Sequence, residues 1–287
     1  MLKKTAFVCG YPIGQTLSPF IHRHWLKLYQ KKGDYEPIQV SINDFESFFT
    51  KTALKKFIGG NITIPHKERA YALADLCEEA VRKIGAANMV WYEKGKICVG
   101  NSDVYGFNAN LDSYFNDWAG GVALVFGAGG AARAVIYALK DRGCEKIYVV
   151  NRTLQRAEDL SDYFGTSVLA YSWDKISTIM PVVDLIVNTT SKDMGKKVVS
   201  TSEALCGWPD FTKAKDDALV VDIVYKPLIT PFLHLAQQRG LRIIDGLGML
   251  LHQAVPGFEK WFGLRPHVDE SLREAVLQEL ARKNIFP

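Results

Sequence analysis

The 287-residue sequence lacks several features that would place it in a specialised class of proteins. No apolar run reaches the ~18 residues of a membrane-spanning helix, and Pro12 interrupts the first apolar run too early for a signal peptide. The chain has an odd number of cysteines, none close to another: Cys9, Cys77, Cys98, Cys144 and Cys206. This set supports neither a disulfide framework nor a zinc site, and it predicts reduced, buried packing residues in a cytoplasmic protein.

A concentrated charge of one sign is also missing. The formal net charge is +4, from 35 Lys and Arg against 31 Asp and Glu, without a basic cluster. Because phosphate backbones are bound by dense basic surfaces, no nucleic-acid partner is expected. The six histidines, including His22 and His24, have no ligand partners at metal-binding spacing. We therefore predict no metal site.

The first ~105 residues alternate between strand and helix patterns, which is typical of a small α/β unit. Strands are expected at 5–10, 35–40 and 57–64, and a helix capped by Ser18 with Pro19 in its first turn. After Pro65, the residues Leu73, Cys77, Ala80 and Ile84 lie on one face of a single expected helix. Gly85 would end this helix, and two strands would follow around a Lys94-Gly95 turn.

A helix over residues 104–117 is expected to join this unit to a second one. There the alternation restarts, with strands at 122–126, 146–150, 184–188, 219–223 and 241–244 and a helix at about 130–141. This pattern indicates a parallel, doubly wound sheet of the Rossmann type. Two helices, at 248–263 and 269–283, are expected to close the chain.

The turn after the first of these strands carries a dinucleotide-binding pattern. Gly127, Gly129 and Ala132 form Gly-x-Gly-x-x-Ala between an apolar strand and a helix start. Small residues let the backbone approach a pyrophosphate, and the helix start attracts its charge. The alternative is a merely tight strand–helix turn. The expected cofactor-binding residues here are Gly127, Ala128, Gly129, Gly130 and Ala131.

The end of the next strand distinguishes NADP from NAD. NAD-binding proteins usually place Asp or Glu there to accept hydrogen bonds from the ribose hydroxyls. This sequence has Asn151 followed by Arg152, with Arg156 four residues further on. Arginine presents a planar fork of donors suited to phosphate, so NADP is favoured. Two solvated surface arginines are the alternative.

Lys67 is the candidate catalytic residue of the first unit. It lies at an expected helix start, where the unpaired N–H groups disfavour a positive charge unless it is compensated. Asn61 and Thr63 precede it with alternating spacing, so they share one face of a strand end. Asp103 lies between a strand and the connecting helix and could hold the ammonium. A protonated lysine can donate to a carbonyl oxygen that becomes an alkoxide.

These residues lie in longer segments that resemble one known family, shikimate dehydrogenase, over nearly the whole chain. The segments are GYPIGQTLSPFIH, GGNITIPHK, IGAANM, GNSDVYGF, GAGGAARA, NRTLQRA, DIVYKPLITPFL and GLGMLLHQAVPGFEKWFG. The resemblance implies NADPH-dependent reduction of 3-dehydroshikimate to shikimate, in chorismate and aromatic amino acid biosynthesis. It also implies two domains, with residues 1–107 and 246–287 binding substrate and residues 108–245 binding NADP. Hydride transfer is then expected across the cleft between them.

The resemblance also assigns roles to individual residues. It implies that Lys67 and Asp103 form the catalytic pair. The remaining substrate-binding residues are Thr16, Ser18 and Tyr225 at the carboxylate and Thr63, Asn88 and Gln253 at the ring hydroxyls, with Asn61 beside Thr63. The cofactor-binding residues are Asn151, Arg152, Thr153 and Arg156 at the adenosine phosphate and Ile223, Gly246 and Met249 near the nicotinamide.

Two positions depart from the family pattern. Thr16 replaces the usual Ser, which narrows the pocket and leaves the preference between shikimate and quinate open. Met89 replaces the usual Thr, which removes a hydroxyl next to Asn88. We expect altered hydrogen bonding around Asn88 there, with activity retained.

Other functions remain as alternatives. One is the same fold acting on quinate or an amino-substituted analogue. Another, an enzyme like glutamyl-tRNA reductase, would need an N-terminal nucleophilic cysteine, whereas Cys9 lies inside an expected strand. A third is an NADPH sensor without catalysis, in which Lys67 and Asp103 would be superfluous. The protein is expected to act on its small-molecule substrate as a monomer or homodimer.

Overall fold

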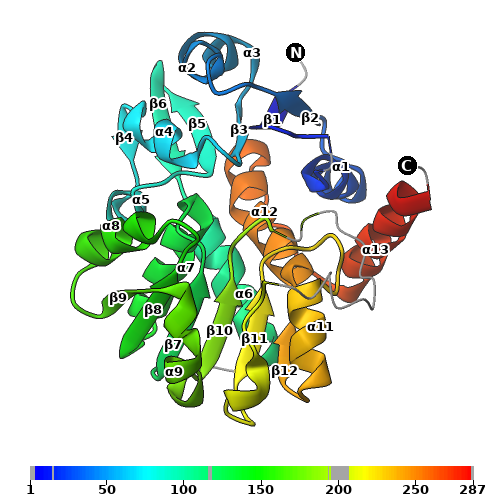
Figure 1. Cartoon of the computed structure of the whole chain (residues 1–287). Helices are drawn as coiled ribbons and strands as arrows, with labels where there is room; N and C mark the ends of the chain where they lie inside the picture. The colour runs from blue at the N-terminus through cyan, green and yellow to red at the C-terminus, as the bar shows by residue number, and fades with distance from the viewer. Residues whose placement is uncertain (1–3, 15, 116–117, 193, 195–206, 286–287) are drawn as a thin grey trace. The chain divides into compact units, whose positions relative to one another are not determined.

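A computed structural model describes residues 4–14, 16–115, 118–192, 194 and 207–285 of the chain, so Cys206 lies outside the described residues. The chain divides into two compact units (Figure 1). The first consists of Met1–Gly106 and Leu251–Pro287, and the second of Phe107–Leu250. Both boundaries fall inside helices, α6 (Asp103–Tyr114) and α12 (Gly246–Phe262).

The first unit contains a mixed six-stranded sheet in the order β2-β1-β3-β5-β6-β4. Its strands are β1 (Thr5–Gly10), β2 (Asp34–Gln39), β3 (Gly59–Ile62), β4 (Leu76–Cys77), β5 (Met89–Glu93) and β6 (Lys96–Gly100). The strand β1 pairs in parallel with both β2 and β3, whereas β5 is antiparallel to β3 and β6. The expected strands are therefore confirmed, as is the turn between β5 and β6, where Lys94 and Gly95 both have positive φ.

The helices of the first unit are α1 (Ser18–Leu28), α2 (Phe45–Ser47), the π-helical turn η1 (Phe48–Ala53), α3 (Leu54–Lys56), α4 (Lys67–Ala72), α5 (Glu79–Ile84) and α13 (Glu270–Ile285). The helical elements over residues 45–56 were not anticipated. Leu17, not Ser18, is the N-cap of α1, so the predicted serine cap is wrong.

The single helix predicted after Pro65 is also wrong, because β4 separates α4 from α5 and pairs with β6 through Leu76 and Cys77. Gly85 ends α5 in the left-handed conformation, as predicted.

The second unit contains a fully parallel six-stranded sheet in the order β12-β11-β10-β7-β8-β9. Its strands are β7 (Val122–Phe126), β8 (Lys146–Val150), β9 (Val168–Tyr171), β10 (Leu185–Asn188), β11 (Leu219–Asp222) and β12 (Arg242–Ile244). The helices and 3-10 turns are α7 (Gly130–Asp141), α8 (Leu154–Phe164), η2 (Trp173–Lys175), α9 (Ile176–Ile179), η3 (Met180–Val182), η4 (Phe211–Lys213) and α11 (Pro231–Gln238). The doubly wound prediction is confirmed, although β9 was not anticipated.

Packing of helices on this parallel sheet places the loops that could bind a ligand. Helix α7 contacts β7, α8 contacts β8 and β9, and α11 contacts β11 and β12. Phe126, Trp208 and Phe232 lie in the core beneath, and burying each such side chain stabilises the fold by about 1.5–3 kcal/mol. Since parallel strands end at one sheet edge, the loops after β7, β8, β10 and β11 meet there.

Among the described residues, no helix combines the length and apolarity needed to cross a membrane.

Candidate active site

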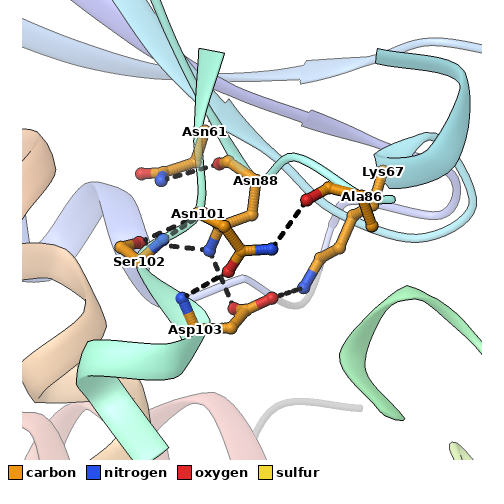
Figure 2. Close-up of polar contacts among 7 residues, drawn as sticks. All are labelled: Asn61, Lys67, Ala86, Asn88, Asn101, Ser102 and Asp103. Atoms are coloured by element: carbon orange, nitrogen blue, oxygen red, sulfur yellow. Dashed lines mark hydrogen bonds and ion pairs between the residues drawn. The ribbon is translucent and has the colours of Figure 1, made fainter. Parts of the chain in front are cut away.

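Lys67 and Asp103 form a buried ion pair in the first unit (Figure 2). Lys67 begins α4 and Asp103 begins α6, and Lys67 Nζ lies 2.5 Å from Asp103 Oδ2. Their side chains are 12% and 2% exposed. The carboxylate supplies the compensation that a lysine at a helix start requires. The sequence left this contact open, and their catalytic role stays a prediction.

Asp103 is held at its carboxylate by Asn88 as well as by Lys67, and at its backbone by Asn101. Asn88 Nδ2 donates to Asp103 Oδ1 over 2.8 Å, and the backbone N–H of Asp103 donates to Asn101 Oδ1 over 2.9 Å. A buried carboxylate is tolerated only when its oxygens are paired in this way. Both oxygens are thus directed, one toward Lys67 and one toward Asn88.

Asn88 is fixed at its amide oxygen and at its backbone. The N–H of Ser102 donates to Asn88 Oδ1 over 2.7 Å, which sets the orientation of the amide. The carbonyl of Asn88 accepts from the N–H of Ile62 at 2.9 Å and from Asn61 Nδ2 at 3.1 Å. Asn61 Oδ1 in turn accepts from the Tyr35 hydroxyl at 2.6 Å. Ser102 and Tyr35 were not anticipated, because no local spacing links them to this site.

Thr63 follows β3 and is located by a close approach of the backbone. An added Cβ at Gly10 would lie 2.4 Å from Thr63 Cγ2 and 2.9 Å from the carbonyl oxygen of Ile64. The N–H of Thr63 donates to the carbonyl of Cys9 at 2.9 Å. Gly10, which sequence reasoning used only as a strand end, therefore gives Thr63 its place.

The other predicted substrate-binding residues lie in both units. Thr16 and Ser18 are adjacent in the first unit, where the N–H of Ser18 donates to Thr16 Oγ1 at 3.3 Å. Gln253 is half-buried on the part of α12 that belongs to the same unit. Tyr225 lies in the second unit, in the segment after β11.

The second unit has a cavity of about 680 Å³ at the end of β8. It is lined by the four residues predicted to bind the adenosine phosphate, Asn151, Arg152, Thr153 and Arg156, and also by Lys192 and Trp208. None of the described lining residues is a carboxylate. This donor set fits a 2′-phosphate better than a ribose diol, which would need an acceptor.

Lys192 is a cation of this cavity that the sequence did not predict. Its Nζ lies 4.3 Å from the ring centre of Trp208 and donates to the carbonyl of Gly207. It follows β10 in a loop, and its approach to β8 depends on the order of the strands in the sheet. Sequence spacing carries no signal for such a contact.

The glycine-rich turn after β7 leaves room for a ligand. Gly127 has φ of 109°, and an added Cβ there would lie 2.5 Å from Thr189 Oγ1. Gly129 is the N-cap of α7 and faces open space, and Gly130 begins the helix. An open approach to the start of a 12-residue helix fits a pyrophosphate. Ala128 and Ala131, in the same turn, add no bulk.

Two of the three residues predicted near the nicotinamide lie against each other. An added Cβ at Gly246 would be 2.4 Å from the carbonyl oxygen of Ile223, so only glycine fits there without movement. Met249 is buried one turn further along α12. All three belong to the second unit.

Comparisons with known proteins agree with this geometry. Residues 8–90 match the family model described as the shikimate dehydrogenase substrate binding domain, residues 110–247 match shikimate / quinate 5-dehydrogenase, and residues 246–277 match the shikimate 5′-dehydrogenase C-terminal domain.

Among curated proteins, shikimate dehydrogenase (NADP(+)) of Bartonella tribocorum is 52% identical, covering 97% of this chain and 95% of that one. The enzyme of the same name from Brucella abortus is 50% identical, covering 97% and 96%. Among solved structures, shikimate 5-dehydrogenase of Thermus thermophilus, in complex with NADP(H) and shikimate, has a TM-score of 0.83 at 33% identity, covering 96% and 99%.

Proposed function

The chain belongs to the shikimate dehydrogenase family, and from this premise we propose that Lys67 and Asp103 carry the proton transfer of its reaction. The reaction is the reversible NADPH-dependent reduction of 3-dehydroshikimate to shikimate, in aromatic amino acid biosynthesis. The observation that supports the roles of Lys67 and Asp103 best is their buried contact of 2.5 Å.

Reduction of the ketone breaks the C=O π bond and forms a C–H and an O–H bond. Bound NADPH supplies the hydride to carbon. Lys67 donates its proton to the carbonyl oxygen as negative charge develops there, and it regains a proton from water. Asp103 touches Lys67 Nζ and holds the ammonium in place. In the oxidation of shikimate the same groups act in reverse.

Substrate recognition is assigned to short hydroxyl, phenol and amide groups. The hydroxyls of Thr16, Ser18 and Tyr225 would bind the carboxylate of the substrate. Thr63, Asn88 and Gln253 would bind its ring hydroxyls. Support comes from the half-buried positions of Thr63 and Gln253.

The cofactor is assigned to the second unit. Arg152 and Arg156, with Asn151 and Thr153, would hold the 2′-phosphate in the cavity after β8. The turn 127–131 would hold the pyrophosphate, and Ile223, Gly246 and Met249 would lie at the nicotinamide. The cationic cavity without a carboxylate among its described lining residues favours NADP over NAD.

An assay of the purified protein on shikimate and quinate, each with NADP⁺ and NAD⁺, tests this function. We expect the highest kcat/KM for shikimate with NADP⁺. Thr16 carries one methyl group more than the usual serine. A single methyl group changes the ratio of the kcat/KM values for two substrates, here shikimate and quinate, by about 10- to 200-fold at most. A higher kcat/KM for quinate, or a preference for NAD⁺, would contradict the proposal.

We also propose that the enzyme works in the cytoplasm, as a monomer or homodimer, without a nucleic-acid partner. Support comes from the buried free thiols of Cys9, Cys98 and Cys144, which suit a reducing compartment. Burial raises the pKa of Cys144 to about 12, so this thiol is unreactive at neutral pH. Light scattering during size-exclusion chromatography would measure the oligomeric state.

A further inference from the structure

A path of hydrogen bonds leads from Tyr35, far from the catalytic pair in sequence, to Lys67. It passes from the Tyr35 hydroxyl to Asn61, from Asn61 to the backbone of Asn88, and from the Asn88 side chain to Asp103 and Lys67. Figure 2 shows the part from Asn61 to Lys67. Every link belongs to the first unit.

The bond between Tyr35 and Asn61 spans a strand. Tyr35 on β2 is paired with Ala6 of β1, and Asn61 on β3 is paired with Val8 of the same strand. Paired residues, and residues two apart, project from the same face of a sheet. The phenol therefore reaches over β1 to Asn61, with a distance of 2.6 Å between its oxygen and Asn61 Oδ1.

The Tyr35 ring is held in place by aromatic side chains of two helices. The His22 ring of α1 stacks on it, with 4.0 Å between the ring centres and 5° between the planes. The Trp261 ring of α12 lies 6.0 Å away, and its Nε1 donates to the carbonyl of Val90. Tyr35 is fully buried, and this burial raises its pKa, so the phenol is a neutral donor.

Asn61 is engaged at both ends of its amide. Its oxygen accepts from Tyr35, and its nitrogen donates to the carbonyl of Asn88. The Asn88 carbonyl only accepts hydrogen bonds, so it sets the amide with Nδ2 toward it. The Tyr35 hydroxyl satisfies the amide oxygen, and its removal would leave that oxygen without this donor and loosen the Asn61 side chain.

We infer that Tyr35 and Asn61 are positioning residues for the Lys67–Asp103 pair, acting through the backbone of Asn88. In this role Asn61 acts from inside the protein and not as a substrate ligand, which revises the role expected from its sequence position. The inference rests on the proposed function. It adds residues that touch neither substrate nor reacting atoms but fix the groups that do.

The variant Tyr35→Phe removes only the hydroxyl and keeps the packed ring. Tyr92→Phe is the matched control, because the Tyr92 hydroxyl is also buried in the first unit but has no hydrogen-bond partner among the described residues. We expect Tyr35→Phe to lower kcat for shikimate oxidation about three- to tenfold, the usual effect of one hydrogen bond. The KM values for shikimate and NADP⁺ should stay within twofold, and Tyr92→Phe should match the wild type in all three.

A double-mutant cycle tests the path. Asn61→Leu alone should lower kcat at least as much as Tyr35→Phe, and the double variant should be no worse than Asn61→Leu, since both break the same link. Independent, multiplicative losses would overturn the inference. So would a rise in the KM for shikimate at unchanged kcat, which would make Asn61 a substrate ligand.

Two further outcomes separate this inference from the proposed function. A wild-type protein that does not oxidise shikimate would refute the function itself. An active wild type with an equally active Tyr35→Phe variant would refute the positioning role alone. Tyr35 and Asn61 lie in the first unit, so the near-UV circular dichroism and the Tm of each variant report on its folding, and unchanged values exclude misfolding as the cause of a lower kcat.

Discussion

At the scale of single residues, Lys67 is a lysine at a helix start, a position that is electrostatically unfavourable unless a negative charge lies nearby. A cation at a helix start is unfavourable, and the Asp103 carboxylate at 2.5 Å compensates it. The Lys67 side chain can therefore carry its charge although it is only 12% exposed. A side chain held in place in this way suits the proposed role of proton donor to a substrate carbonyl.

Replacing Lys67 with alanine should therefore abolish most of the turnover. We expect a fall in kcat of at least ~100-fold, the contribution of a positioned general acid, with a modest change in substrate KM. Steady-state kinetics in both directions would measure it, with Lys83→Ala, at a 58% exposed lysine side chain, as the control. A Lys67→Ala variant with a tenth of the normal turnover would disprove the role.

Arg152 should distinguish the two dinucleotides. Arg152→Ala removes a fork of donors from the cavity that also holds Arg156 and Lys192. We expect the Kd for NADPH to rise at least ~10-fold and the Kd for NADH to change little, because only the former carries a 2′-phosphate. Isothermal titration with both cofactors measures this, and equal losses would refute the phosphate site. Lys192→Gln should shift the same preference in the same direction, but less.

The residues that sequence reasoning found and missed differ in how they reach the site. Lys67, Asp103 and Asn88 lie in segments with a recognisable motif, so they could be identified as candidate site residues from the sequence alone. Tyr35 reaches Asn61 only by crossing β1, and Lys192 reaches the β8 cavity only through the strand order. Such contacts depend on tertiary pairing, which local patterns do not encode.

At the scale of elements, the segment after Pro65 shows why periodicity alone failed. Its apolar residues recur at helical spacing, yet Leu76 and Cys77 form β4 and pair with Cys98 and Val99 of β6. The strand pairing of these two residues with β6 stabilises the segment more than continuing a short helix through it would. In contrast, five strands of the second unit and the helix after the first of them were predicted closely, because apolar strands bounded by glycine and helix starts give a strong local signal.

Helix α1 carries an unusual buried group, His22. Its ring lies against Tyr35, Trp25, Phe258 and Trp261, is 0% exposed, and neither nitrogen has a hydrogen-bond partner among the described residues. Burial lowers its pKa from 6.5 to about 3, so it is neutral in the folded protein. Below pH 6.5 the unfolded chain binds a proton here that the folded chain does not, and stability falls as the pH falls.

His22→Phe should remove this part of the pH dependence while keeping an aromatic ring beside Tyr35. Between pH 7 and pH 5 the wild type should lose about 2 kcal/mol more unfolding free energy than the variant. Urea unfolding at both pH values measures the difference. The same comparison at pH 8, where both folded and unfolded histidine are neutral, isolates the packing change. Parallel pH profiles for the two proteins would contradict a buried neutral His22.

At the scale of the whole molecule, the two units share continuous helices. The boundaries fall within α6 and α12, so neither unit can unfold completely without disrupting a helix that belongs partly to the other. Because helix formation is cooperative, we expect one unfolding transition for the chain rather than two. The proposed ligand sites nevertheless lie in different units, with the Lys67–Asp103 pair in the first and the phosphate cavity in the second.

Differential scanning calorimetry with each ligand tests whether the two units unfold in one transition. A ligand at 100 times its Kd stabilises the folded state by about 2.7 kcal/mol, which corresponds to a rise in Tm of about 5 °C in a chain of this size. NADP⁺ and shikimate should each raise the Tm of the same single transition. At the NADP⁺ concentration used for the wild type, the Arg152→Ala variant should lose the rise in Tm with NADP⁺. It should keep the rise in Tm with shikimate. Two transitions, each raised by one ligand only, would show that the units unfold independently despite their shared helices.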